Sequence, residues 1–190
     1  EKALEAGVDG LILVCAGAGG HSGALSPMAL VSAVRRIYDG LVVLAGSITR
    51  GEHVLAALAM GADMAYMGTR FIATEEANAA PGYKQMIVES SASDVLYTPY
   101  FSSTHVNFLK PSMRAAGLDP DNLVRAPGET AKMAFTSADG SRTVGAKTWK
   151  DIWSAGHGVG AIDEILPVAE LVASLRAQFA AARARLCGSS

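Results

Sequence analysis

The chain has 190 residues, of which half are apolar and 18% are charged, a composition typical of a globular domain with one sizeable core. Its net charge of -2 and its scattered basic residues predict no nucleic-acid and no membrane partner, because both need a clustered positive field. Cys15 and Cys187 lie far apart and suggest neither a disulfide nor a metal site, so a cytoplasmic location is expected.

The first ten residues, "EKALEAGVDG", have the pattern of the last turns of a helix, which ends at Gly7. Because domains rarely begin inside a helix, we expect the chain to be a piece of something longer.

The first half of the chain then alternates short apolar runs with amphipathic segments. The apolar runs predict strands over Gly10–Cys15, Leu41–Gly46, Met64–Thr69 and Asp94–Pro99. The first of these is continuously apolar, which is typical of a strand buried on both faces.

Helices are predicted between these strands, over 26–40, 49–63 and parts of 73–92. In the first helix Ser26 is the expected cap and Pro27 the first helical residue. Its apolar stripe consists of Met28, Leu30, Val31, Val34 and Ile37. In the third segment Glu75 and Glu76 are expected to begin a helix that Pro81–Gly82 interrupts, since carboxylates suit a helix N-terminus.

Strands that alternate with helices over short connections predict a parallel sheet of the α/β class. Two architectures fit this pattern, a doubly wound sheet and a (β/α)₈ barrel, the TIM barrel. The short strand–helix repeats with tight turns favour the barrel. A barrel needs eight strands, and only about four are visible in this sequence. We therefore expect one barrel domain over 1–190, of which the chain covers roughly the C-terminal half plus C-terminal helices.

The second half of the chain follows a different pattern. A short helix is expected near Pro111–Gly117, a loop-rich segment over 125–143 and a glycine-rich turn around His157. A long helix is predicted over 167–186, with one apolar face made of Val168, Leu171, Val172, Leu175 and Phe179.

Glycine-bearing turns follow three consecutive predicted strands, at Gly17–Gly23, Gly46–Ser47 and Gly68–Thr69. In a parallel α/β protein these turns meet at the carboxyl end of the sheet, where ligands bind. Free backbone N–H groups at such turns bind phosphate. The alternative is that the glycines only end strands.

His21 is the best candidate for a catalytic base, because it lies in the first glycine-rich turn and imidazole accepts protons near neutral pH. His53 is expected on a solvated helix face, whereas His105 and His157 could border the site. Cys15 is expected in the core. Packing roles are expected for Trp149, Trp153, Met60, Met64 and Met67.

The ordered motifs "AGGHSG", "LAGSI" and "GADMAYMGTRFIATEE" resemble the nitronate monooxygenase family, long called 2-nitropropane dioxygenases. The similarity extends to "NFLKPSMRAAGLDPDNL" and "WSAGHGVGAI". It implies an FMN-dependent TIM-barrel enzyme, a monooxygenase, that oxidises alkyl nitronates with dioxygen to a carbonyl compound and nitrite.

The resemblance also implies residue roles. His21 matches the catalytic base, and Ala18, Gly19 and Gly20 match the turn that passes against FMN. Gly46 and Ser47 match a Gly-Gly pair that holds the FMN phosphate. The second phosphate turn, usually Gln-Met-Gly-Thr, is matched by Tyr66, Met67, Gly68 and Thr69. Ser47 and Tyr66 therefore depart from the family pattern.

Two alternatives remain open at this stage. One is another flavin enzyme on the same barrel, an NAD(P)H-dependent quinone reductase or an enoyl-thioester reductase. The other is a phosphate-ligand-binding barrel without redox activity. The expected partners are a small-molecule substrate and dioxygen, with a homodimer left open and no metal.

Overall fold

The computed structural model describes residues 2–123 and 150–188, so the predictions for Trp149 and for segment 125–143 lie outside the described residues. The helices are α1 (Lys2–Glu5), α2 (Pro27–Arg35), α3 (Gly51–Ala59), α4 (Thr69–Ile72), α5 (Pro81–Glu89), α6 (Lys110–Ala115) and α7 (Val168–Cys187), with 3-10 helices η1 (Ala92–Asp94) and η2 (His157–Ala161). The strands are β1 (Gly10–Val14), β2 (Gly20–His21), β3 (Leu41–Ala45), β4 (Met64–Tyr66), β5 (Val95–Thr98) and β6 (Val106–Leu109). In this described part, none of the helices combines the length and the apolar character needed to cross a membrane.

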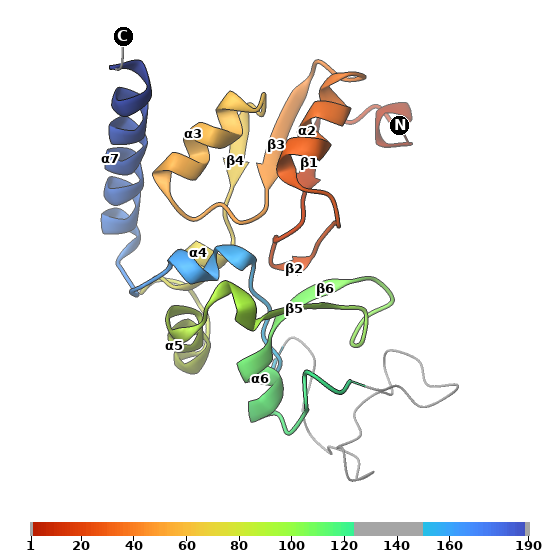
Figure 1. Cartoon of the computed structure of the whole chain (residues 1–190), viewed down its shortest axis with the longest axis vertical. Helices are drawn as coiled ribbons and strands as arrows, with labels where there is room; N and C mark the ends of the chain where they lie inside the picture. Colours follow the sequence, from red (N-terminus) through yellow and green to blue (C-terminus); the bar gives the residue numbers. More distant parts are fainter. Residues whose placement is uncertain (1, 124–149, 189–190) are drawn as a thin grey trace.

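A parallel sheet with the strand order β1-β3-β4 organises the first half of the chain, as predicted. Its strands point their carboxyl ends toward β2 and α4 (Figure 1). The α/β class is therefore confirmed. Among the described residues the parallel strands form an open sheet of three rather than a closed barrel.

Helices α2 and α3 cover one face of this sheet (Figure 1). Ser26 caps α2 as expected, because its hydroxyl accepts a 3.3 Å hydrogen bond from the Ala29 N–H. Val31 of α2 packs into a core with Leu44 of β3. The predicted stripe was wrong at its ends, where Met28 and Ile37 are exposed, because the core contact is confined to the middle of the helix.

The opposite face of the parallel sheet is open. Ile12 and Val14 of β1 are 59% and 39% exposed, and Tyr66 of β4 is 57% exposed. The prediction that the first strand is buried on both faces was therefore wrong. The physical reason is that this face lines a pocket instead of packing against a helix.

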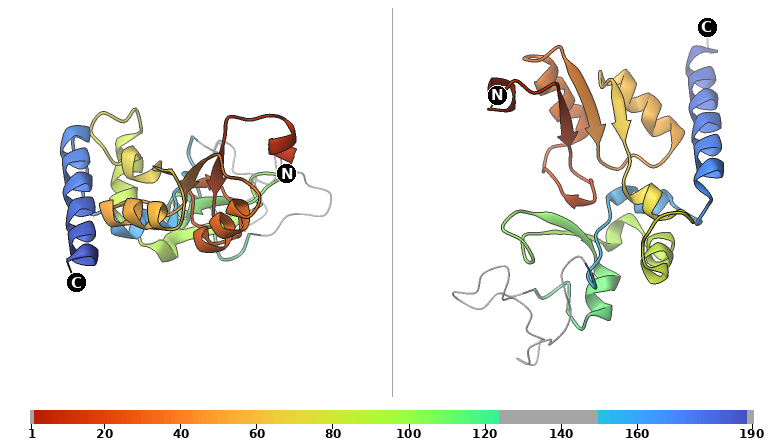
Figure 2. Two further views of the ribbon diagram at one scale, coloured as in Figure 1. Left: turned by 90° about the horizontal axis from the view of Figure 1, so that it is seen from above. Right: turned by 180° about the vertical axis from the view of Figure 1, so that it is seen from behind.

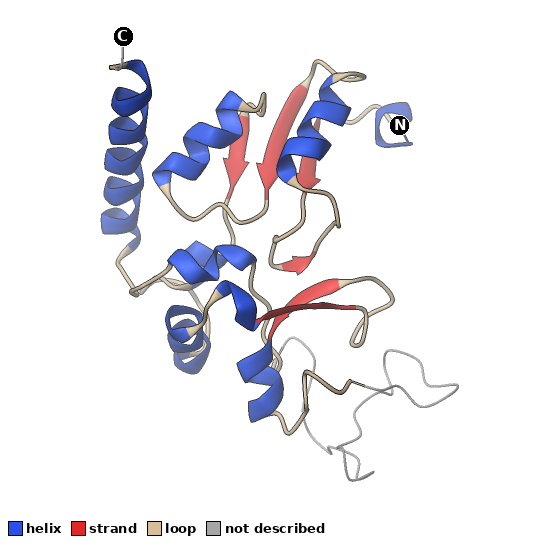
Figure 3. Cartoon of the chain, in the orientation of Figure 1, coloured by secondary structure: helices blue, strands red, loops and turns tan. Residues whose placement is uncertain are grey.

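A second sheet, with the order β2-β6-β5, lies beyond the carboxyl ends of the parallel strands and is antiparallel (Figure 3). The run predicted over Asp94–Pro99 is β5, but it pairs with β6 instead of continuing the parallel sheet. A hairpin partner, β6, stands only a few residues further along the chain, and its four residues are all buried.

The segment around Glu76 also differs from its prediction. Pro81 is the first residue of α5 and does not interrupt a helix, and Glu75 and Glu76 precede that helix as irregular chain. The Glu76 carboxylate instead accepts 2.9 Å hydrogen bonds from the N–H of Val168, at the start of α7. The Glu76 carboxylate therefore still satisfies a helix N-terminus, but this helix is α7, which lies far along the chain from Glu76.

Helix α7 packs along α3 at the edge of the molecule in both views of Figure 2. The close approach is made at Gly51, whose N–H donates a 2.8 Å hydrogen bond to Oε1 of Gln178. Leu171 is buried as expected, whereas Val172 is 40% exposed and lies off the packed face.

Candidate functional site

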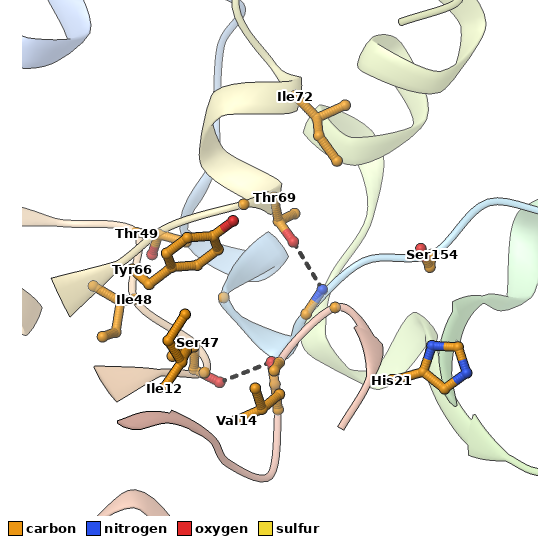
Figure 4. Close-up of a pocket in the computed structure, with 18 residues that line it drawn as sticks. Ile12, Val14, His21, Ser47, Ile48, Thr49, Tyr66, Thr69, Ile72 and Ser154 are labelled. Atoms are coloured by element: carbon orange, nitrogen blue, oxygen red, sulfur yellow. Dashed lines mark hydrogen bonds between the residues drawn. The ribbon is translucent and has the colours of Figure 1, made fainter. Parts of the chain in front are cut away.

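A pocket of about 430 Å³ opens at the carboxyl end of the parallel sheet (Figure 4). All three glycine-bearing turns named from the sequence contribute to its wall. Of the residues singled out there, the pocket is lined by Gly17, Ala18, Gly19, His21, Gly46, Ser47, Tyr66, Gly68 and Thr69. The turns therefore meet as the strand–helix alternation predicts.

The first turn is folded tightly by its glycines. Gly17 and Gly20 have φ angles of +83° and +74°, a backbone region that glycine adopts without steric cost. The Gly17 carbonyl accepts a 2.9 Å hydrogen bond from the N–H of His157. A Cβ at Gly19 would lie 2.8 Å from the Gly156 nitrogen, so the two glycine segments pass in direct contact.

The second turn contains an unusual serine. Ser47 has a φ of +55°, and it is the one non-glycine residue in the described ranges with a positive φ. This conformation favours glycine, which is the residue that the resemblance implies at this position. The Ser47 hydroxyl lies 3.4 Å from the carbonyl oxygen of Gly17 and connects the first two turns.

The third turn is tied to a distant part of the chain. The Thr69 hydroxyl accepts a 2.9 Å hydrogen bond from the N–H of Gly156, as drawn in Figure 4. Gly68 precedes Thr69, and a Cβ built on it would meet open space. Residues of the segment 154–158 therefore form one side of the pocket wall, whereas the space beside Gly68 is empty.

These turns leave hydrogen-bond donors available. Within the described residues, the backbone N–H groups of Ser47, Ile48, Gly68 and Thr69 donate to no backbone or side-chain acceptor. All four residues line the pocket. Free backbone N–H groups at such turns bind phosphate oxygens, so this lining fits a phosphate-bearing cofactor.

His21 lies on β2, and its imidazole is on the side of the pocket opposite Tyr66 and Ile48 in Figure 4. Its Nε2 is 3.4 Å from the hydroxyl oxygen of Ser102. Among the residues that line the pocket, His21 and Tyr66 are the titratable ones, and an imidazole is the group that exchanges protons near neutral pH. The geometry therefore offers a single candidate base.

Two residues named from the resemblance do not line the pocket. Gly20 lies in β2, where it pairs with Asn107. Met67 packs against the core beside the parallel sheet. Any contact of these two residues with a cofactor remains a prediction.

The other histidines have local partners. His53 Nδ1 accepts a 3.3 Å hydrogen bond from the Thr49 N–H at the start of α3. The ring of His105 lies 4.7 Å from the ring of Tyr97 and outside the pocket wall. His157 is exposed beside Gly17, and its neighbours Gly156 and Gly158 line the pocket.

Packing roles are confirmed for most of the sulfur and aromatic side chains. Cys15 is fully buried, and burial raises the pKa of its thiol, which disfavours the reactive thiolate. Trp153 stacks on Tyr83 with 5.1 Å between ring centroids. Met60 packs against the core, but Met64 is 54% exposed because it lies on the open face of β4.

Sequence reasoning missed several residues of the pocket. The missed lining residues are Ile12, Val14, Ala45, Ile48, Thr49, Ile72, Ser154, Gly156 and Gly158. The alternation of side chains along β1 would have placed Ile12 and Val14 on one face. The segment around Ser154 has a glycine-rich pattern, but no local signal shows that it returns to the first turn.

Comparisons with known proteins match this chain over most of its length. A family model described as nitronate monooxygenase matches residues 1–178. A nitronate monooxygenase of Paraburkholderia phytofirmans is 30% identical over 182 residues, which cover 90% of this chain and 49% of that protein. The chain thus spans about half the length of this curated relative.

Solved structures show the same likeness. FabK of Thermotoga maritima is 28% identical, with a TM-score of 0.80 over 100% of this chain and 60% of that chain. A nitroalkane oxidase of Streptomyces ansochromogenes is 30% identical, with a TM-score of 0.71 over 97% of this chain and 56% of that chain.

Proposed function

Because this chain belongs to the nitronate monooxygenase family, we propose that it carries the cofactor site and the catalytic base of an FMN-dependent oxidoreductase. The proposed reaction is the oxidation of an alkyl nitronate with dioxygen to a carbonyl compound and nitrite. The observation that carries the proposal is one pocket whose lining includes both His21 and turns with available N–H donors.

The turns suit the phosphate end of FMN. The N–H groups of Ser47, Ile48, Gly68 and Thr69 would hold its phosphate oxygens. Because these contacts come from the backbone, they tolerate the serine at position 47. FMN, when bound, supplies the redox chemistry.

His21 would act on substrates that arrive as neutral nitroalkanes. Its imidazole would take the proton from the carbon next to the nitro group and so generate the nitronate. General-base catalysis of this kind typically contributes about 10² to 10⁴ in rate. A preformed nitronate would not need this step.

The remaining wall favours an apolar substrate. Ile12, Val14, Ile48 and Ile72 line the pocket and present hydrocarbon. These side chains would bury an alkyl group and keep water from the reacting atoms. Ser154, whose side chain is labelled in Figure 4, adds a hydroxyl to the same wall.

The absorption spectrum of the purified whole protein tests the proposal. We expect flavin bands in the purified protein, followed by nitrite formation and oxygen uptake when a nitronate is added under air. A protein that neither carries nor takes up FMN would overturn the cofactor assignment. A protein that holds FMN but forms no nitrite would overturn the substrate class.

A reductase on the same fold is the second candidate, and the TM-score of 0.80 with FabK favours it. Under this alternative, NADH or NADPH would bleach the flavin bands in the absence of oxygen, without any nitronate. The same spectrometer experiment with a nicotinamide as the added reagent therefore separates the two candidates.

A further inference from the structure

Asn107 occupies an unusual position next to the loop that carries His21. It lies on β6, is 1% exposed, and pairs with Gly20 of β2; the two strands lie side by side in Figure 1. Its Nδ2 donates a 2.7 Å hydrogen bond to the carbonyl oxygen of Ala18 and a 3.1 Å hydrogen bond to Oγ of Ser22. One buried amide therefore holds the chain on both sides of His21.

The other end of this amide is not satisfied. Among the described residues, Asn107 Oδ1 is buried and has no hydrogen-bond partner. A buried polar atom without a partner destabilises the folded state. The asparagine therefore contributes through its Nδ2 end, because an apolar side chain in its place would leave the Ala18 carbonyl without this donor.

Two further side chains near β5 and β6 contact the same loop. The hydroxyl of Tyr97 on β5 donates a 3.0 Å hydrogen bond to the Ser22 carbonyl. The Ser102 hydroxyl lies 3.4 Å from His21 Nε2. Of these side-chain contacts, that of Asn107 with Ala18 is the shortest and the most deeply buried.

We propose that Asn107 is a positioning residue for His21, and this inference rests on the proposed function. Asn107 does not line the pocket, so it acts through the loop and not on the substrate. A base must lie within hydrogen-bond reach of the proton that it takes. A displacement of about 1 Å can reduce the rate about a hundredfold, and the Nδ2 bonds restrain the loop against such a displacement.

The first experiment compares nitroalkane and nitronate turnover in Asn107→Leu and Ser22→Ala. Leu is close in size to Asn but cannot donate to Ala18. We expect kcat/KM for the nitroalkane to fall about tenfold to a hundredfold, with nitronate turnover and FMN content near those of the wild type. Ser22→Ala removes only one acceptor, so it should give a smaller fall of the same kind and a variant with little risk to folding.

A double variant tests whether Asn107 acts through His21. In a His21→Asn background the base is already absent, so Asn107→Leu should not lower nitroalkane turnover further. If the two losses multiply, or if nitronate turnover falls as much as nitroalkane turnover, the positioning role is wrong and Asn107 is a general structural residue.

Amide hydrogen exchange gives a readout that does not depend on activity. In Asn107→Leu, residues 17–23 should exchange faster than in the wild type, while β1 and β3 keep their protection. Unchanged exchange in the loop would overturn the inference. A wild-type protein that holds FMN but turns over neither substrate would overturn the proposed function instead, and the exchange result would then decide alone whether Asn107 orders the loop.

Discussion

The Thr69 hydroxyl accepts a 2.9 Å hydrogen bond from the N–H of Gly156, a buried contact between residues 87 positions apart in the chain. It joins the turn after β4 to the segment that passes against the first turn. The pocket wall therefore depends on a contact that neither segment could make alone.

Replacing Thr69 by Val keeps the shape of the side chain but removes this acceptor. The Gly156 N–H would then be buried without a partner, so the free energy of unfolding should fall by about 1–3 kcal/mol. FMN binding should weaken as the wall loosens. Thr69→Ser keeps a hydroxyl and is the control; urea unfolding that shows equal stability for the two variants would contradict this prediction.

Gly68 offers a test of the phosphate turn that is separate from folding. Its φ is -109° and a Cβ there meets nothing within 4 Å, so Gly68→Val should leave the melting temperature nearly unchanged. The same side chain would project into the open space of the pocket and should weaken FMN binding about tenfold or more. Flavin titration of the variant checks this, and full flavin occupancy would exclude Gly68 from the phosphate site.

Gly156→Ala is the matched control for Gly68→Val. A Cβ at Gly156 would collide with the carbonyl oxygen of Gly17. This variant should lose stability and flavin together, whereas Gly68→Val should lose flavin alone.

Replacing Ser47 by glycine should stabilise the folded protein. A left-handed backbone costs a non-glycine residue roughly 1–2 kcal/mol, whereas the extra chain entropy of glycine costs about 0.5–1 kcal/mol. Ser47→Gly should therefore raise the free energy of unfolding by up to about 1 kcal/mol and retain FMN. Ser47→Val should lower it, because a β-branched residue suits this conformation least; urea unfolding of both variants measures the difference.

Asp63 makes the stability of the parallel sheet depend on pH. Its pKa is lowered by a 2.8 Å hydrogen bond from the N–H of Val42 and by the Arg35 guanidinium, 2.7 Å away. A lowered pKa in the folded state gives stability that is present above the ordinary carboxyl pKa of about 4 and is lost as the pH falls through the lowered value. The free energy of unfolding should therefore decrease on acidification.

Asp63→Asn should flatten this dependence, because it removes the titrating group. Urea unfolding at about pH 6 and about pH 3 measures the slope. Part of the slope should remain, because hydrogen bonds from Ser91 and Arg50 also lower the pKa of Asp94 and Glu52. An unchanged slope would show that Asp63 does not contribute.

Local patterns were sufficient to predict the parallel sheet and its two covering helices. Ser26 and Pro27 define the start of α2 by capping, and the apolar runs of β1 and β3 are too short for buried helices, which favours strands. The three turns also met as predicted, because parallel strands bring their carboxyl ends to one edge.

The other features of the fold and of the pocket could not be predicted, because they depend on contacts between segments far apart in the chain. A short apolar run such as Val95–Thr98 can enter a parallel or an antiparallel sheet, and only its partner β6 decides between them. Likewise, nothing local marks Asn107 as a buried amide that contacts Ala18. Residues that depend on segments far apart in the chain were therefore missed, whereas His21, with its own glycine-rich context, was singled out from the sequence and does line the pocket.

The His21→Asn variant tests the catalytic base itself. Asparagine keeps some hydrogen bonding but cannot accept the proton, so nitroalkane turnover should fall by about 10² to 10⁴. Nitronate turnover should be largely kept, because a nitronate needs no deprotonation. FMN should stay bound, since the N–H groups of the turns and not this side chain would hold the phosphate.

The decisive quantity is the ratio of nitroalkane to nitronate turnover in the wild type and in His21→Asn. If His21 takes the proton, this ratio should fall sharply in the variant, because only the nitroalkane needs a base. Equal losses on both substrates with flavin retained would mean that His21 orders the loop or the substrate and takes no proton. The 3.4 Å approach of its Nε2 to the Ser102 hydroxyl would then be a structural contact.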